Sequence, residues 1–249
     1  MALDPLNSSH QKTCINSNSI HGKIKSINNR NQVSFFTWNF GTINIRSGKE
    51  KSEGSKLYMV AKEAARANLL ICCLQEVKYR NDGKKLITLD SGEKYIFIWC
   101  GQKKRREAGV GILIKDCPEV TFDEPDITNP RLIALNIQVK GFRIRMVNVY
   151  SPTNCDDSDN LKDAFYRMLK KSCEKQHKQQ KLIVLGDFNA TTAVSLGKNH
   201  FDGRQIINDS ICNDNGLRLK SLCRELRLCM SQTYYDHPKE KRFTWFSGD

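Results

Sequence analysis

Apolar residues along this chain recur in two patterns, one typical of buried strands and the other of amphipathic helices. The segments VSFFTWN at 33–39 and NLLICCLQE at 68–76 contain continuous apolar runs of strand length. Between them, the segment GSKLYMVAKEAARA spaces its apolar residues as one face of a helix. These residues are Leu57, Val60, Ala61 and Ala64. The chain is therefore predicted to begin its folded part as strand, helix, strand.

The remainder of the chain extends this alternation. Four strand-like segments follow, as in a meander within a mixed sheet: YIFIWC, GVGILI, RLIALNIQV and FRIRMVNVY. A helix is predicted over 160–174, and it leads into the apolar strand at 181–186. The segment 213–235 repeats the order of helix and strand. Together these patterns predict an α/β fold.

The domain organisation follows from the same patterns. Residues 1–32 are rich in Asn, Ser and Lys and have no apolar periodicity, so we expect a disordered polar tail there. Residues 33–249 are expected to form one domain, because a chain of 249 residues with 39% apolar residues can bury a sizeable core.

Polar side chains close several of the predicted strands. Asn39, Glu76 and Tyr150 each end an apolar run, and Asp187 and Asn189 follow another. If these strands share a sheet, the side chains converge at its edge. Carboxylate and amide oxygens suit Mg²⁺ or Mn²⁺, and a second carboxylate suits a water oriented against a phosphate. A simpler alternative is that Asp187 and Asn189 only shape a tight turn.

The charge balance of the chain is strongly basic. Forty Lys and Arg residues against 27 Asp and Glu residues give a formal net charge of +13. Such an excess favours a polyanionic partner, most simply nucleic acid, although a generally Lys-rich surface is an alternative. Positive charge clusters at Lys103, Lys104, Arg105 and Arg106, which we take as a candidate nucleic-acid contact. A second basic run at 170–181 could instead be the solvated end of a helix.

The cysteines and the lengths of the apolar runs indicate the cellular compartment in which the protein is expected. The ten cysteines are scattered or lie in apolar strands, and no pair has C-x-x-C spacing, so we interpret them as buried thiols in a reducing environment. No apolar run approaches the roughly 20 residues that cross a bilayer. We therefore expect a monomer inside the cell, in the nucleus or cytoplasm, without membrane contact.

Four short motifs stand in a fixed order between Thr37 and Ala190: TWN, LQEVK, NVYSPT and GDFNA. This ordered set resembles the endonuclease/exonuclease/phosphatase superfamily, which includes abasic-site endonucleases, neutral sphingomyelinases and the endonuclease domains of non-LTR retrotransposons. The segments GVGILI, NVYSPT and NDNG look most similar to the retrotransposon-derived branch that includes craniofacial development protein 2-like proteins. The resemblance implies a DNase I-like α/β sandwich of two mixed sheets. It also implies Mg²⁺-dependent hydrolysis of phosphodiesters in DNA.

The resemblance also implies a role for each polar residue at a strand end. Glu76 would be the carboxylate on the catalytic metal, and Asn39 would support that metal or its water. Tyr150 would donate a hydrogen bond to the scissile phosphate. Asp187 would orient and deprotonate the attacking water, and Asn189 would hold the phosphate or that water.

Two features complicate this assignment. The segment GTINIRS also resembles the first motif of the family, which makes Asn44 a rival of Asn39, and Thr244 has at most a weak assisting role. The chain ends at Asp249, before an acidic motif and a closing Ser-Asp-His motif of the family, so the domain is expected to be incomplete at its carboxyl end. A non-catalytic nucleic-acid-binding remnant and a phosphatase of the same superfamily are therefore alternative functions.

Overall fold

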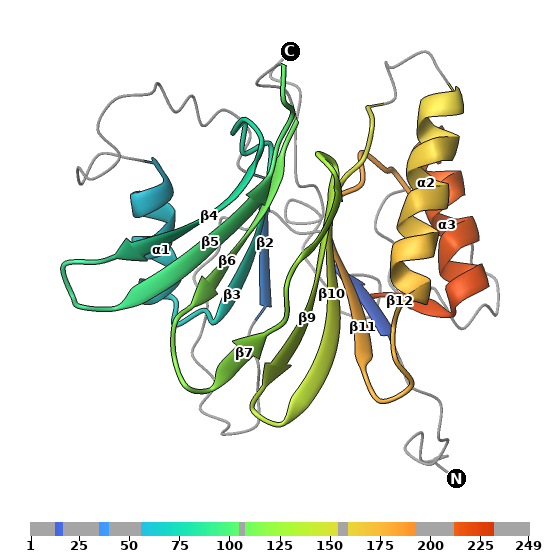
Figure 1. Ribbon diagram of the computed structural model, residues 1–249. Coiled ribbons are helices and arrows are strands. Elements are labelled where there is room, and N and C mark those ends of the chain that lie inside the picture. The colour runs from blue at the N-terminus through green and yellow to red at the C-terminus, as the bar shows by residue number, and fades with distance from the viewer. Residues whose placement is uncertain are drawn as a thin grey trace, which may run out of the picture.

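The computed structural model describes residues 13–16, 35–39, 56–104, 108–153, 159–192 and 212–231. Two sheets pack face to face, with helices on the outer side of each sheet (Figure 1). The expected α/β sandwich of two sheets is therefore confirmed. No helix in the described ranges combines the length and the apolar character that crossing a bilayer demands.

The first sheet contains five strands and carries α1 (Lys56–Arg66) on its outer face. Its strands, in spatial order, are β2 (Phe35–Asn39), β3 (Ile71–Gln75), β6 (Val110–Lys115), β5 (Lys94–Cys100) and β4 (Asp82–Thr88). β2 and β3 are parallel, and the other pairs are antiparallel. The parallel pair is joined through α1, whose four expected apolar residues are all buried. The order strand, helix, strand expected for this region is confirmed.

The second sheet carries α2 (Asp159–Glu174) and α3 (Asp214–Leu226) on its outer face (Figure 1). Its strands, in spatial order, are β12 (Leu228–Met230), β1 (Thr13–Asn16), β11 (Lys181–Asp187), β10 (Phe142–Tyr150), β9 (Leu132–Val139) and β7 (Val120–Phe122), with β8 (Asp126–Asn129) also paired to β9. β10 runs parallel to β11 and antiparallel to β9. The carboxyl ends of β10 and β11 therefore lie side by side.

One strand lies where we expected a disordered tail. Thr13–Asn16 forms β1, which pairs in parallel with β11 on one side and with β12 on the other. The structure thus differs from the expectation for these four residues, and the rest of 1–32 lies outside the described residues. Four residues are too few to show a periodic pattern, and neighbours on both sides supply the hydrogen bonds that define the strand.

The side chains of β10 point alternately into two layers of the core, one beneath the helices and one between the sheets. Val147 and Val149 face the helices, whereas Ile144 and Met146 face the opposite sheet. Burial of both faces explains why this strand is an almost continuous apolar run. Asn148 continues the series that faces the other sheet and is fully buried, which places a polar side chain in an apolar layer.

Candidate active site

Three of the predicted site residues meet at one edge of the sandwich. Glu76 directly follows β3 in the first sheet, while Tyr150 and Asp187 end β10 and β11 in the second sheet and are partners in the parallel register. Burial raises the pKa of Tyr150, and the charges of Glu76 and Asp187 together with a hydrogen bond to Glu76 raise it further. The phenol therefore lies close to both carboxylates, although the three residues come from two different sheets.

The backbone after β3 adopts an uncommon conformation that turns Glu76 toward this edge. Glu76 and Lys78 both have positive φ angles, of 54° and 53°. The amide groups of Val77 and Lys78 donate to the carbonyl oxygens of Gly109 and Ala108, which holds the segment in place. Non-glycine residues with positive φ angles are infrequent and tend to gather at functional sites. The Glu76 carboxylate lies 3.8 Å from the Lys78 ammonium group.

Asp187 and Asn189 form the tight turn that was the simpler alternative, and the turn also orients them. The Asp187 carboxylate accepts a hydrogen bond of 2.9 Å from the Asn189 backbone amide. The Asn189 side-chain amide donates to the Ser151 carbonyl oxygen, also at 2.9 Å. The turn therefore joins the segments that follow β10 and β11, and it fixes both polar side chains beside Tyr150.

Gly186 allows β11 to approach β10 immediately before the site. Its φ angle is 139°, and a side-chain carbon at this position would lie 2.0 Å from the Val149 carbonyl oxygen. No other residue fits such a position without moving one of the strands. The glycine thus sets the spacing between Tyr150 and Asp187.

The residues at the start of α3 form hydrogen bonds with the turn that contains Asp187 and Asn189. Asn213, which caps the helix, donates to the Asn189 carbonyl oxygen at 3.1 Å and accepts from the Thr191 amide at 3.0 Å. The buried Asn215 donates to the Pro152 carbonyl oxygen at 2.8 Å. Sequence reasoning matched the NDNG segment to the superfamily but gave these two asparagines no role. An asparagine before a helix is a capping signal, but its contact with a distant turn depends on the tertiary fold.

A buried polar contact joins the strands that carry Glu76 and Tyr150. The Gln75 side-chain amide donates to the Asn148 side-chain oxygen at 2.6 Å, and both residues are almost fully buried. Asn148 also donates to the carbonyl oxygens of Leu74 and Gly111, at 3.0 and 2.8 Å. Such a network fixes the relative position of the two sheets one residue from Glu76 and two from Tyr150.

Arg131 is a residue of the site that sequence reasoning missed. Its guanidinium carbon lies 5.2 Å from the centre of the Tyr150 ring, and one of its nitrogens donates to the carbonyl oxygens of Tyr150 and Ser151. Its positive charge lowers the pKa of Tyr150, against the larger effects of burial and the carboxylates. Arg131 precedes β9 and belongs to no motif. Only the antiparallel pairing of β9 with β10 brings it beside Tyr150.

Of the other residues considered for the site, the structure describes only the backbone of Asn39. Asn39 ends β2 opposite Gln75, so its backbone lies next to the residue before Glu76, but its side chain is not described. Asn44 and Thr244 lie outside the described residues. The preference for Asn39 over Asn44 stays a prediction.

Two of the four residues in the basic cluster are described. Lys103 and Lys104 are exposed, whereas Arg105 and Arg106 lie outside the described residues. The pairing of Gln75 with Val110, and of Val110 with Cys100, places the end of β5 at the same edge as the end of β3. The two lysines therefore leave the sheet at the edge that carries Glu76.

The donor groups at this edge suit a hard divalent cation. The described residues contain no group of three or more His, Cys, Asp or Glu side chains that could hold a metal ion. Mg²⁺, however, is usually bound through one or two carboxylates and completed by water and substrate phosphates. The carboxylates of Glu76 and Asp187 are the described side chains at this edge that could contribute oxygen ligands to such a site.

Comparison with known proteins gives a family match and several similar proteins. Residues 41–204 match the model of the endonuclease/exonuclease/phosphatase family. Craniofacial development protein 2 from Tragulus javanicus and from Bos taurus are each 29% identical over 84% of this chain. The chain spans about a third of the length of these curated relatives, 34% and 33% respectively.

Two solved structures are also similar. The endonuclease domain of TRAS1, a telomere-specific non-LTR retrotransposon, has 19% identity and a TM-score of 0.41, over 67% of this chain and 63% of that one. TDP2 from D. rerio, complexed with a single-stranded DNA product, has 13% identity and a TM-score of 0.45, over 70% of this chain and 73% of that one. The family match itself covers more than half of the 249 residues. The chain therefore belongs to the endonuclease/exonuclease/phosphatase family.

Proposed function

We propose that this chain is a metal-dependent phosphodiesterase that cleaves DNA. The observation that carries the proposal is the meeting of Glu76, Tyr150 and Asp187 at one edge of the sandwich. Two carboxylates and a phenol at this position can bind a cation, orient a water and donate a hydrogen bond. Family membership supports hydrolysis of a phosphate ester as the type of chemistry.

Asp187 would orient and deprotonate the attacking water. One of its oxygens accepts the hydrogen bond from the Asn189 amide, which fixes the rotation of the carboxylate. The Asn189 side chain is itself held by the Ser151 carbonyl oxygen. A carboxylate fixed in this way can direct a water in line with the bond to be broken, and its base function does not require a large movement.

Tyr150 would donate a hydrogen bond to the substrate phosphate. A phenol with the ordinary pKa of 10 already keeps its proton at neutral pH, and burial with the two neighbouring carboxylates raises the pKa of Tyr150 further. A protonated phenol can stabilise negative charge that develops on a phosphate oxygen. Arg131 packs against the ring and limits the positions that the phenol can reach.

Glu76 would hold Mg²⁺ or Mn²⁺. Either Asn39 or Asn44 would support that cation or its water. When bound, the cation supplies positive charge that stabilises the phosphate and the leaving oxygen. The contact between Gln75 and Asn148 keeps the Glu76 strand in position relative to the strands of Tyr150 and Asp187.

The charge of the chain supports DNA as the substrate. The net charge of +13 favours a polyanion, and exposed Lys103 and Lys104 leave the sheet at the edge that carries the carboxylates. Cations beside a phosphodiesterase site attract the backbone on both sides of the scissile bond. A small phosphate ester would gain less from such an arrangement than a DNA strand would.

The experiment incubates the purified chain with supercoiled plasmid in Mg²⁺, in Mn²⁺ and in EDTA, and measures the nicked form. A phosphomonoester substrate is run in parallel. We expect nicking that depends on the cation and little release of phosphate from the monoester. Release of phosphate without nicking would identify a phosphatase instead. DNA binding with no hydrolysis of either substrate would identify a non-catalytic remnant.

A further inference from the structure

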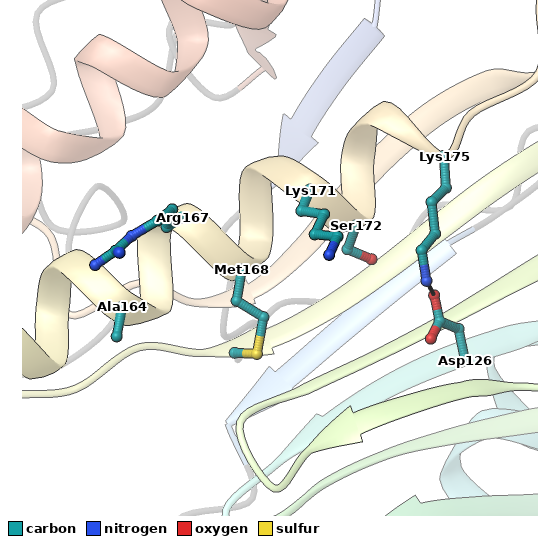
Figure 2. Close-up of a pocket in the computed structure, with 7 residues that line it drawn as sticks. All are labelled: Asp126, Ala164, Arg167, Met168, Lys171, Ser172 and Lys175. Atoms are coloured by element: carbon teal, nitrogen blue, oxygen red, sulfur yellow. Dashed lines mark hydrogen bonds and ion pairs between the residues drawn. The ribbon is translucent and has the colours of Figure 1, made fainter.

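A pocket lies between α2 and β8, and its lining shares no residue with the candidate active site. It has a volume of about 470 Å³. Most of its lining comes from α2, which covers the outer face of the second sheet (Figure 1). Figure 2 shows the residues that line it: Asp126, Ala164, Arg167, Met168, Lys171, Ser172 and Lys175. None of them belongs to the candidate active site, so the pocket requires a separate explanation.

Positive charge dominates the rim of this pocket. Arg167, Lys171 and Lys175 are exposed. Arg167 and Lys171 lie one turn apart on one face of α2, and Lys175 directly follows the last residue of that helix. The Lys175 ammonium group lies 2.7 Å from the Asp126 carboxylate. Within the described part of the chain, Arg167 and Lys171 have no carboxylate within ion-pair distance.

Several other cations of the helical layer are paired. Lys162 lies 3.1 Å from Asp214, and Lys170 lies 2.7 Å from Glu225. Arg218 contacts Asp163 as well as Asp214. Against this background, Arg167 and Lys171 stand out as cations that are available to an external anion. They lie one helical turn apart at the mouth of the same pocket.

The acidic residue of the pocket does not cancel this charge. Asp126 accepts from Arg145 at 3.0 Å and from Lys175 at 2.7 Å through the same oxygen. Arg145 is almost fully buried and also donates to the Ser172 carbonyl and hydroxyl oxygens, at 3.2 and 3.3 Å through one nitrogen. The carboxylate is thus held between two cations, and the lining carries a net positive charge.

The floor of the pocket is apolar. Ala164 and Met168 are the apolar residues of the lining, and both lie on α2 (Figure 2). A thioether makes favourable contacts with the faces and edges of aromatic rings and adapts its shape to them. Apolar surface surrounded by cations suits a planar ring attached to an anionic group, and a volume of about 470 Å³ is within the range of small-ligand sites.

We propose that this pocket binds one nucleotide unit of a single-stranded nucleic acid, with its phosphate on Arg167 and Lys171 and its base against Met168. A base in a duplex is stacked between its neighbours and cannot lie on the pocket floor, whereas a base in a single strand can. The choice of nucleic acid as the anion rests on the proposed function. The pocket would thus hold a single strand at a second position, separate from the edge where cleavage is proposed.

The test measures binding of a fluorescently labelled oligothymidylate by anisotropy, in EDTA and at several salt concentrations. The variants are the double substitution Arg167→Gln with Lys171→Gln, and the single substitution Met168→Gln. The matched control replaces Lys62 and Lys94, which are exposed and distant in the fold, by Gln, so that the same net charge is removed. Glutamine is a good helix former, and circular dichroism checks that each variant is folded.

The double variant should bind the single strand at least tenfold more weakly than the control does. The slope of log affinity against log salt should become shallower by about 0.7, since one phosphate of a single strand contributes about 0.7 and the two cations hold one phosphate. Met168→Gln should weaken binding of the single strand more than binding of a duplex of equal length. Equal losses in the double variant and the control would overturn the proposal, because only overall charge would then matter.

Two further outcomes would also overturn it. If the pocket variants lost affinity for single strand and duplex equally, no base would occupy the pocket. If they lost binding to vesicles that contain phosphatidylserine but kept binding to the oligonucleotide, the cations would serve a membrane surface instead. Because all binding is measured in EDTA, it is read without cleavage, and a failure of the nicking experiment would leave this test intact.

Discussion

The side-chain amide of Gln75 donates a 2.6 Å hydrogen bond to the side-chain oxygen of Asn148, across the interface between the two sheets. Gln75 ends β3 and directly precedes Glu76, and Asn148 lies two residues before Tyr150, which ends β10. An unpaired polar group in an apolar layer costs free energy, so each of these side chains must stay within hydrogen-bonding distance of the other. The contact therefore ties the geometry of the candidate site to the packing of the core.

A double-mutant cycle measures this coupling. Gln75→Leu and Asn148→Leu should each destabilise the fold by about 2–4 kcal/mol, since each leaves a buried polar partner facing an apolar group. The double substitution should be less destabilising than the sum of the two by about 1–3 kcal/mol. Urea unfolding of the four proteins gives the coupling energy. Purely additive effects would show that the two side chains do not depend on each other.

Removal of the Tyr150 hydroxyl should affect catalysis far more than folding. Tyr150→Phe keeps the ring that packs against Arg131 but removes the proposed donor, so kcat for plasmid nicking should fall on the order of 10²-fold. The thermal unfolding midpoint should change little. A variant with the kcat of the original chain would remove Tyr150 from the catalytic mechanism.

The pH dependence of nicking offers an independent check on Tyr150. Its pKa is raised, so the phenol should stay protonated as the pH rises through 10, its ordinary value. The kcat of the original chain should therefore show no alkaline loss near pH 10 that is absent from Tyr150→Phe. A loss confined to the original chain would contradict the raised pKa.

Arg131 is expected to act as a positioning residue for Tyr150. Arg131→Met removes both hydrogen bonds to the carbonyl oxygens and the contact with the ring, so kcat should fall about tenfold, whereas KM should change less. Arg131→Lys retains the charge but lacks the planar fork, and it should recover only part of the loss. Full recovery in the lysine variant would indicate that the charge alone matters.

The ion pairs of Asp126 should contribute to stability in a defined pH range. Burial raises the pKa of Asp126, but hydrogen bonds from Lys175 and Arg145 outweigh this effect and lower the pKa below its ordinary value of 3.8. A lowered pKa means that the contribution is complete above about pH 4 to 5 and is lost as the pH falls through the folded-state value. Asp126→Asn should reduce the free energy of unfolding at pH 7 by about 1–3 kcal/mol. It should also flatten the decline in acid, and an unchanged acid profile would contradict this assignment.

Much of the fold could be predicted from the sequence because its signals are local. The helix with buried Leu57 and Val60 and the apolar strands at 71–75 and 181–187 were expected from periodicity. β1 was not expected, because a strand of four residues acquires its structure from β11 and β12. Sequence patterns cannot show such pairing between distant segments.

Local sequence signals also identify only some of the residues of the candidate site. Glu76, Tyr150 and Asp187 could be selected because each closes an apolar strand and belongs to a motif. Arg131 and Asn213 could not, because strand pairing and helix packing bring them to the site. The basic pocket on α2 was also missed, since its lining combines one face of a helix with Asp126 from another part of the chain.

The most direct test of the central claim is the rate of plasmid nicking by Asp187→Asn at saturating Mg²⁺. Asparagine keeps an oxygen that can accept the hydrogen bond from Asn189 but cannot act as a base, so the site should keep its shape. Asp116→Asn, which changes an exposed carboxylate away from the site, is the matched control. We predict that Asp187→Asn nicks plasmid about 10³-fold more slowly than the original chain, and that the control nicks at the original rate. Nicking by Asp187→Asn at the rate of the control would contradict the claim that this edge of the sandwich is the active site.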